Sequence, residues 1–389
     1  MSLSTFFNCC RPKNWLGEPE FTADLPLDEE VAPPSCFETL GGRIVSTIYT
    51  AGALLVAKKD FEGAREKIKQ LDGHELKTIR TWDGVSLDTV YMPGTVKKAV
   101  ILAPGIGDRF ESLAIDGSLL QHIQKVIREQ LGDVTMVSPN VRGFGWSEGS
   151  FAPKRLHIDI HSVHQYLVNN EGFAPEDIFI FGESFGGCSG IRAAALVQKS
   201  YPDKNISAIP DRSFLRLKDV VEQRTGGRCT NLVSGILSCT EFDVDCEEAA
   251  KSLKGKILAL GAQEDQTVPF QSFFGAYEEI KELKNLETLY ITGDADFPDP
   301  HTRYWLPEEQ NAIGDALRTL VFGKEPEEIK QEEVVVSLEK DETIATESPS
   351  RELFDDLSPE IKEEKPKQKT AVRRQEQPRR EQPPRKAKR

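Results

Sequence analysis

The sequence predicts an α/β fold with a mostly parallel central sheet, flanked by helices and followed by a disordered C-terminal tail. From residue 98 onward short apolar strands alternate with amphipathic helices, and parallel neighbours need such crossovers to return the chain. One strand runs into Gly-Glu-Ser-Phe-Gly-Gly at 182–187, which indicates a tight turn leading into a helix. Beyond residue 323 aromatic residues almost vanish and Glu, Lys, Pro and Gln dominate, a composition that cannot bury a core.

The patterns along the chain predict four regions. Residues 1–40 read as an irregular lead that contains several prolines, and residues 41–73 as a helical segment that packs on the core or lies at a membrane surface. Residues 74–322 form the α/β domain, in which a weakly patterned stretch at about 202–252 is expected to be a small insertion or cap. Residues 323–389 are expected to be a disordered tail, acidic at first and then basic.

The elements before the first parallel strand are expected to be a helix and a hairpin. The helix runs from about Arg43 to Leu71, and its second half is charged and amphipathic. Residues 74–92 alternate in polarity on both sides of Asp83-Gly84, a turn dipeptide. Two antiparallel strands are therefore predicted there.

The rest of the domain is predicted from the period of its apolar residues. Short apolar runs predict strands, and longer amphipathic segments predict helices. The strands are expected at 98–103, 134–138, 178–181, 256–261 and 287–292. The helices are expected at 118–131, 155–169, 187–201, 270–283 and 307–322. Because several strands are almost wholly apolar, the sheet is expected to be buried on both faces.

Ser184 lies at the apex of the predicted strand, turn and helix. A serine in such a turn extends its hydroxyl beyond the sheet edge, and Gly182 and Gly186 lack the Cβ atoms that would clash where the chain doubles back. The bare G-x-S-x-G pattern arises by chance in roughly one chain of this length in ten, given glycine's frequency near 7%. The surrounding pattern therefore carries the prediction that Ser184 is a nucleophile.

A turn after strand 98–103 is a candidate oxyanion site. In open α/β sheets, active groups collect on loops beyond the carboxyl ends of strands. The N–H of Ile106 in this turn, together with the N–H of Phe185 after the nucleophile, is expected to bind the oxyanion of a tetrahedral intermediate. Taken alone, the turn is equally well a simple connection to a helix.

A carboxylate after strand 256–261 is a candidate for the acid that orients a catalytic histidine. Asp265 stands before a Val-Pro pair at this strand end, with Glu264 as the reserve candidate. Either residue alone is more often a surface or helix-capping carboxylate.

The order of the histidines selects His301 as the base. The six histidines are His74, His122, His157, His161, His164 and His301. Only His301 follows both the serine and the acid, as the order Ser, Asp, His requires. The histidines at 157, 161 and 164 share one helix face, and in the absence of neighbouring ligands a solvated or packed face is preferred to a metal site. The remaining two are expected to be structural.

These segments together resemble the α/β-hydrolase family over roughly residues 74–322. The resemblance rests on GESFGG, on APGIG at 103–107, on NVRGFGWSEG at 140–149 and on GAQEDQTVP at 261–269. It implies the hydrolase fold and says nothing of the substrate. The size, the long lead and the basic tail also look similar to the chlamydial 43 kDa protein family of presumed hydrolases.

Two positions depart from the family's pattern, and one segment lacks a role. The family commonly closes with G-x-G-H, and the corresponding string at 293–296 puts Asp296 where the base would sit. Either the base has moved five residues to His301 or it is missing. Pro104 replaces the usual His of the oxyanion turn, which is tolerable because the oxyanion contact is a backbone N–H. The stretch Pro210–Phe214 resembles one in related hydrolase-like proteins, without a chemical role that we can assign.

Three functions are weighed. The favoured one is a serine hydrolase that cleaves an ester or thioester, conceivably of a lipid, without metal or cofactor. The alternative, which the shifted base supports, is a catalytically silent scaffold that binds partners through its charged tail. A nucleic-acid-associated protein is the third and depends wholly on that tail.

Charge separates the domain from the end of the chain. The formal net charge of −14 argues against nucleic-acid binding by the core. Residues 365–389 instead carry eleven Lys and Arg against two Glu. Such an end is usually solvated; otherwise it suits an acidic protein, an anionic membrane, a nucleic acid or a nuclear import receptor.

Cysteine usage and the apolar runs bear on the compartment. Seven scattered cysteines do not form a disulfide framework, which favours a reducing compartment. Since no standard signal peptide is visible, a cytoplasmic location is expected, with membrane association or export without such a signal as alternatives. The apolar run at 44–57 is shorter than the roughly twenty residues that cross a bilayer, and it is expected to pack on the domain or to contact a membrane surface.

Overall fold

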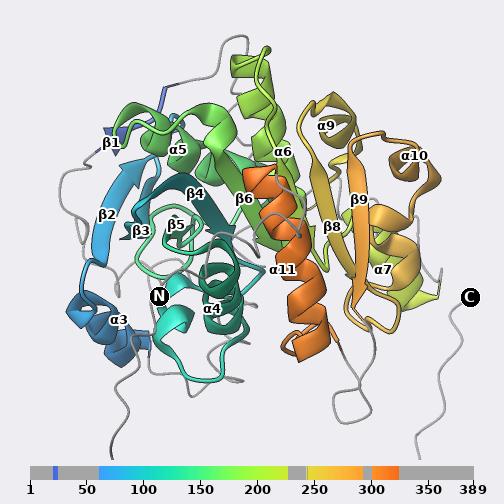
Figure 1. Cartoon of the computed structure of the whole chain (residues 1–389), viewed down its shortest axis with the longest axis horizontal. Coiled ribbons are helices and arrows are strands. Elements are labelled where there is room, and N and C mark those ends of the chain that lie inside the picture. Colours follow the sequence, from blue (N-terminus) through green and yellow to red (C-terminus); the bar gives the residue numbers. More distant parts are fainter. Residues whose placement is uncertain (1–20, 25–60, 227–241, 243, 292–299, 324–389) are drawn as a thin grey trace, which may run out of the picture. The chain divides into compact units, whose positions relative to one another are not determined.

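One mostly parallel sheet forms the centre of the domain (Figure 1). The computed structural model describes residues 21–24, 61–226, 242, 244–291 and 300–323. Within these residues nine strands pair: β1 (Phe21–Thr22), β2 (Glu75–Arg80), β3 (Ser86–Met92), β4 (Val96–Ala103), β5 (Val134–Pro139), β6 (Ile178–Glu183), β7 (Ala208–Asp211), β8 (Ile257–Ala262) and β9 (Leu286–Ile291). Their order is β1-β2-β3-β5-β4-β6-β7-β8-β9, with β3 antiparallel to both its neighbours and the other pairs parallel.

Helices cover both faces of the sheet. The helices of the described residues are α3 (Phe61–Gln70), α4 (Leu119–Leu131), α5 (Leu156–Asn169), α6 (Phe185–Ser200), α7 (Leu217–Thr225), α9 (Glu247–Ser252), α10 (Glu278–Lys281) and α11 (Pro307–Phe322). The apolar faces of α4 and α11 belong to one buried cluster, and those of α5 and α6 to another. Figure 1 shows α11 lying across the strands next to α4.

The alternation of side chains along the strands explains why two cores form. Val100 and Leu102 of β4 belong to the cluster with α4 and α11, whereas Ala99 and Ile101 belong to the cluster with α5 and α6. Successive residues of a strand face opposite sides of a sheet. A strand that is apolar throughout therefore fills both cores, and the predicted architecture of a parallel sheet between helices is confirmed.

The antiparallel hairpin at 74–92 is also confirmed, as β2 and β3, but its connection is longer than a two-residue turn. The register pairs Arg80 with Ser86. The N–H of Thr81 donates to the carbonyl of Val85 at 2.8 Å, so five residues close the loop. Gly84 has φ +88° within it, a conformation that glycine adopts without steric cost.

The helix expected over 270–283 is wrong. The structure has two 3₁₀ turns, Phe270–Ser272 and Phe274–Ala276, followed by the short helix α10. Phe273 and Phe274 are both buried, and Phe273 lies between the two 3₁₀ turns. At Gly275 an added Cβ would lie 2.8 Å from the Phe273 ring, so this close packing fixes the irregular path.

The stretch expected to be an insertion contributes a strand to the sheet. β7 pairs with β6 and β8, and sequence analysis missed it because it has four residues and contains Pro210, which cannot donate a ladder hydrogen bond. The helices α7 and α9 follow it, and 227–241 lie outside the described residues. Whether the later part of this stretch is a cap stays a prediction.

Several predictions fall on residues that the structure does not describe. They concern the lead at 1–20, the apolar run at 44–57, the tail beyond 323 and Asp296. The predicted helix ending at Leu71 is seen in its second half as α3. In the described part of the chain no helix combines the length and the apolar character that crossing a membrane requires.

Candidate active site

Ser184 occupies the turn between β6 and α6 in a backbone conformation that side chains rarely adopt. Its φ is +52° and its ψ is −116°, which costs on the order of 1–3 kcal/mol for a residue with a Cβ. The Ser184 N–H donates to the carbonyl of Asp211 at 2.8 Å. A Cβ at Gly186 would lie 2.1 Å from the carbonyl oxygen of Ala103. Glycine there lets the end of β4 approach the turn that holds the serine.

His301 bridges Ser184 and Asp265. Its Nε2 lies 3.1 Å from Ser184 Oγ, and its Nδ1 lies 2.8 Å from Asp265 Oδ2. Since a carboxylate only accepts, Nδ1 of the neutral ring carries the proton and Nε2 accepts from the serine hydroxyl. His301 is 5% exposed, and it comes from the segment before α11. The three side chains that the sequence selected thus form one hydrogen-bonded chain.

The acid is fixed by its own loop after β8. Asp265 Oδ1 accepts the N–H groups of Thr267 at 2.8 Å and Val268 at 2.7 Å. Its other oxygen therefore faces His301, whereas Glu264 is exposed. The structure favours the first of the two candidate acids.

The charges around His301 stabilise its protonated form. Burial lowers the pKa of the imidazole, but the hydrogen bond and charge of Asp265, together with the charge of Glu183, outweigh burial and raise the pKa above its ordinary value. Arg212 opposes this rise. A proton that the imidazole takes from the serine is thus well accommodated.

The predicted oxyanion turn lies beside the residue that precedes the serine. The N–H of Gly105 donates to Glu183 Oε2 at 3.1 Å. Phe185 is buried and packs edge-on against Phe151 and Phe214. The contacts of the described residues do not test whether the N–H groups of Ile106 and Phe185 bind an oxyanion, so those two roles stay predictions.

Sequence reasoning missed the charged groups that surround the histidine. Burial raises the pKa of Glu183, with the negative charges of Asp108 and Asp211 acting in the same direction. Asp211 and Arg212 form a fully buried ion pair at the end of β7. The position of Glu183 next to the serine and the unexplained stretch Pro210–Phe214 were the available signals.

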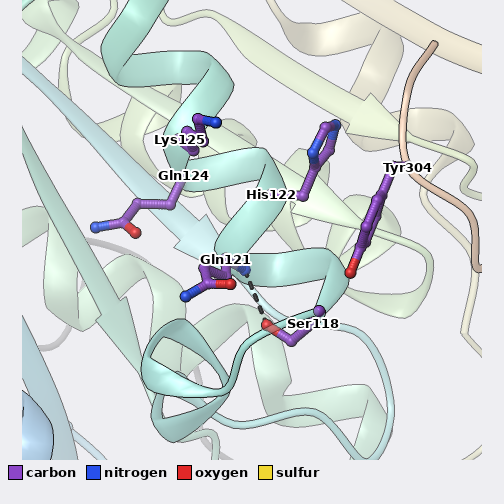
Figure 2. Close-up of a pocket in the computed structure, with 7 residues that line it drawn as sticks. Ser118, Gln121, His122, Gln124, Lys125 and Tyr304 are labelled. Atoms are coloured by element: carbon purple, nitrogen blue, oxygen red, sulfur yellow. Dashed lines mark hydrogen bonds between the residues drawn. The ribbon is translucent and has the colours of Figure 1, made fainter. Parts of the chain in front are cut away.

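The other histidines lie apart from this chain of contacts. His161 and His164 are buried in α5, where burial lowers the pKa of the first to about 3 and of the second to about 4. They belong to a packed helix face, as the preferred interpretation expects. His122 stacks on Tyr304, with ring centres 4.6 Å apart (Figure 2).

A pocket of about 460 Å³ opens at the start of α4 (Figure 2). It is lined by Gly117, Ser118, Gln121, His122, Gln124, Lys125 and Tyr304. Ser118 caps the helix by accepting the N–H of Gln121 at 3.1 Å. None of the lining residues belongs to the hydrogen-bonded chain, so the geometry of Ser184, His301 and Asp265 defines the candidate site and this pocket does not.

Comparison with known proteins gives partial sequence matches at low identity. No family model matches the chain. The uncharacterized protein R595 of Acanthamoeba polyphaga mimivirus is 24% identical over 240 residues, which cover 59% of this chain and 76% of that protein. A multifunctional-autoprocessing repeats-in-toxin of Vibrio vulnificus is 24% identical over 251 residues, which cover 64% of this chain and 4% of the toxin. The chain thus spans a small part of that toxin.

The fold of this chain is similar to that of a solved structure. The crystal structure of an alpha-beta hydrolase from Vibrio vulnificus superposes with a TM-score of 0.51 and 19% sequence identity. The match covers 76% of this chain and 99% of that one. At this identity the likeness shows a shared fold and leaves the reaction open.

Proposed function

We propose that this chain, which has the α/β-hydrolase fold, is a serine hydrolase that cleaves an ester or a thioester. One observation carries the proposal. Ser184 Oγ, His301 and Asp265 are joined by contacts of 3.1 and 2.8 Å, and they come from the turn after β6, the segment before α11 and the loop after β8. A nucleophile, a base and an acid within hydrogen-bond reach are the arrangement that acyl transfer requires.

In the proposed reaction Ser184 Oγ attacks the acyl carbon while His301 Nε2 takes its proton. The imidazolium is held by Asp265, and it then returns the proton to the leaving alkoxide or thiolate. The N–H groups of Ile106 and Phe185 stabilise the oxyanion of the tetrahedral intermediate. A water molecule, deprotonated by the same histidine, hydrolyses the acyl-enzyme and regenerates the serine.

The silent-scaffold alternative is not favoured. Its support was the Asp296 position, which suggested that the base had been lost. His301 Nε2 at 3.1 Å from the serine oxygen removes the need for a base at that position. The charged tail can recruit a partner whether or not the domain is an enzyme.

Hydrolysis of a small panel tests the proposal. We expect turnover of short-chain and long-chain p-nitrophenyl esters and of an acyl thioester, lost in Ser184→Ala and in His301→Ala. Long-chain preference supports a lipid acyl group, and short-chain preference rejects it. Activity that survives in Ser184→Ala would contradict the proposed nucleophile, and full activity in His301→Ala would contradict the base alone.

We also propose a family relationship, a location and a partner class for this chain. Kinship with the chlamydial 43 kDa protein family rests on size, lead and basic tail. A cytoplasmic location rests on cysteine usage, and Cys188 and Cys246 are free thiols in the structure. Contact of residues 365–389 with an acidic protein or an anionic surface rests on their charge alone.

A further inference from the structure

We propose that Arg212 is a positioning residue that fixes the segment carrying His301, and that Asp211 in turn fixes Arg212. The inference rests on the proposed hydrolase function and assigns a role to the stretch Pro210–Phe214. In the described structure Arg212 makes no hydrogen bond to the Ser184 side chain, and no contact with the substrate is proposed for it. It acts through the backbone on either side of the base.

The guanidinium of Arg212 is held in one orientation by the neighbouring carboxylate. Arg212 Nε donates to Asp211 Oδ1 at 3.0 Å, and Nη2 donates to Asp211 Oδ2 at 2.5 Å. Both side chains are fully buried. A two-pronged pair of this kind fixes the plane of the guanidinium as well as its charge.

The remaining guanidinium nitrogen, Nη1, binds the backbone of the segment that carries His301. Arg212 Nη1 donates to the carbonyls of Pro300 at 3.1 Å, His301 at 3.2 Å and Arg303 at 3.0 Å. These three carbonyls bracket the base in the chain. A single nitrogen therefore sets the path of the backbone from which the imidazole extends.

The backbone of the same two residues touches the strands that carry the nucleophile and the acid. The carbonyl of Asp211 accepts the N–H of Ser184 at 2.8 Å, and the N–H of Arg212 donates to Leu260 in β8 at 2.7 Å. The end of β7 thus joins the ends of β6 and β8. The Arg212 side chain also joins these strand ends to the segment that carries His301.

The backbone conformation of Arg212 supports a role beyond packing. Among the described residues, Ser184 and Arg212 are the two non-glycine residues with positive φ, at +52° and +46°. Such conformations cost free energy and persist where the surroundings enforce them, most often at functional sites. The turn after β7 also fits tightly, because a Cβ at Gly187 would lie 2.5 Å from Ser213 Cβ.

The charge of Arg212 acts on the base separately from its geometry. Asp265 and Glu183 face His301 with negative charge, and Arg212 opposes them by lowering the pKa of the imidazole. Asp211 is paired with the guanidinium, and its negative charge also interacts with His301. Loss of the positive charge of Arg212 should therefore raise the pKa of His301. Loss of the guanidinium geometry alone, with the positive charge kept, should not.

Two substitutions separate these effects. Arg212→Lys keeps a buried positive charge opposite Asp211, but a single ammonium group cannot replace the two-pronged contact with the carboxylate together with the contacts to the three carbonyls. Arg212→Gln removes the charge as well. The double variant Asp211→Asn with Arg212→Gln removes both charges. It leaves no unpaired buried ion, and it therefore replaces Arg212→Gln if that single variant does not fold. Arg142→Gln is the matched control, since Arg142 is equally buried and pairs with Asp83 and Asp159.

The test compares hydrolysis kinetics and labelling of the serine by a fluorophosphonate. We expect kcat and the labelling rate to fall about 100-fold in Arg212→Lys, in Arg212→Gln and in the double variant, the size of effect that a misplaced catalytic group produces, with KM for a short ester nearly unchanged. The acidic limb of the pH profile should stay in place in Arg212→Lys and move to higher pH in Arg212→Gln. Arg142→Gln should label at the wild-type rate once corrected for the folded fraction.

A second readout keeps the inference separate from the hydrolase proposal. Proton NMR of the wild-type protein should show a low-field resonance from His301 Nδ1–H bound to Asp265, identified by its loss in His301→Gln. We expect it to broaden or vanish in Arg212→Lys and to persist in Arg142→Gln. If the wild type neither hydrolyses nor labels, the hydrolase proposal fails and this resonance alone decides the role of Arg212.

The positioning role is overturned by any of three results. These are wild-type kcat and labelling in Arg212→Lys, an equal loss in the folded fraction of Arg142→Gln, or an unchanged Nδ1–H resonance in both single Arg212 variants.

Discussion

Arg212 and Arg142 are both buried arginines that follow a strand of the sheet and pair with aspartates, yet they hold different parts of the molecule together. Every hydrogen bond that the Arg142 guanidinium makes in the described structure goes to Asp83 or Asp159. It thereby ties the hairpin loop to α5. Arg212 has one aspartate and gives its remaining nitrogen to three carbonyls around His301.

Burial and ion pairing therefore do not by themselves indicate a functional role for an arginine. A guanidinium whose donors are used by two carboxylates is a cross-link between elements, and its loss leaves buried charges unpaired. A guanidinium that also binds backbone carbonyls around the base, as Arg212 does around His301, sets the position of the imidazole on which the reaction depends. What the spare donors contact distinguishes the two.

Among the substitutions of the supporting residues, we expect the largest loss of kcat from replacing the acid, Asp265. Asp265→Asn should lower kcat about 10⁴-fold, because an amide at this position stabilises the wrong tautomer of His301. Stability should change little, since the loop contacts of Oδ1 can be kept by the amide oxygen. Steady-state kinetics and thermal unfolding measure the two quantities.

Glu264→Gln is the matched control for that change. Glu264 is adjacent in the chain and exposed, and its replacement should leave kcat at the wild-type value. A loss in Glu264→Gln as large as that in Asp265→Asn would mean that the loop as a whole, and not one carboxylate, supports the base.

The largest effect on the side of the fold is expected from Arg142. Arg142→Gln should lower the free energy of unfolding by about 3–5 kcal/mol, because it leaves buried Asp159 without its guanidinium partner and Asp83 with only the longer contact to Arg155 at 3.8 Å. Urea denaturation measures this loss. The kcat of the folded fraction should be unchanged, and a kcat reduced as much as in Arg212→Gln would erase the distinction between the two arginines.

The smallest expected effect is a displacement of the pH profile. Hydrolysis needs the neutral imidazole of His301, and its neighbours raise the pKa of that group. The acidic limb of kcat/KM should therefore be centred above the ordinary histidine value of about 6.5, with activity lost as the pH falls through it. A limb centred below that value would show that burial, and not Asp265 and Glu183, dominates around the base.

The sequence was sufficient to predict the architecture and to select the three side chains that the structure brings together. Strand ends are marked by the change from apolar to polar residues, and parallel strands gather their ends at one edge of the sheet. Chain order then left His301 as the histidine after both Ser184 and Asp265. Such reasoning works because it needs strand positions and no side-chain distances.

The supporting residues could not be predicted in this way. β7 has four residues and includes Pro210, so its pattern does not predict a strand. Without β7 in the predicted sheet, Arg212 could not be placed next to the site. The three carbonyls it binds lie about ninety residues further along the chain. The helix predicted over 270–283 failed for a related reason, since tertiary packing of Phe273 and Gly275 overrides the local pattern.

The most direct test of the central claim, that Ser184 is a nucleophile activated by His301, is covalent capture by a fluorophosphonate followed by peptide mass mapping. We predict one label per chain on Ser184, abolished in Ser184→Ala and slowed strongly in His301→Gln, with Arg142→Gln labelled normally in its folded fraction. A folded wild-type protein that takes no label on Ser184, or a His301→Gln variant labelled at the wild-type rate, would contradict it.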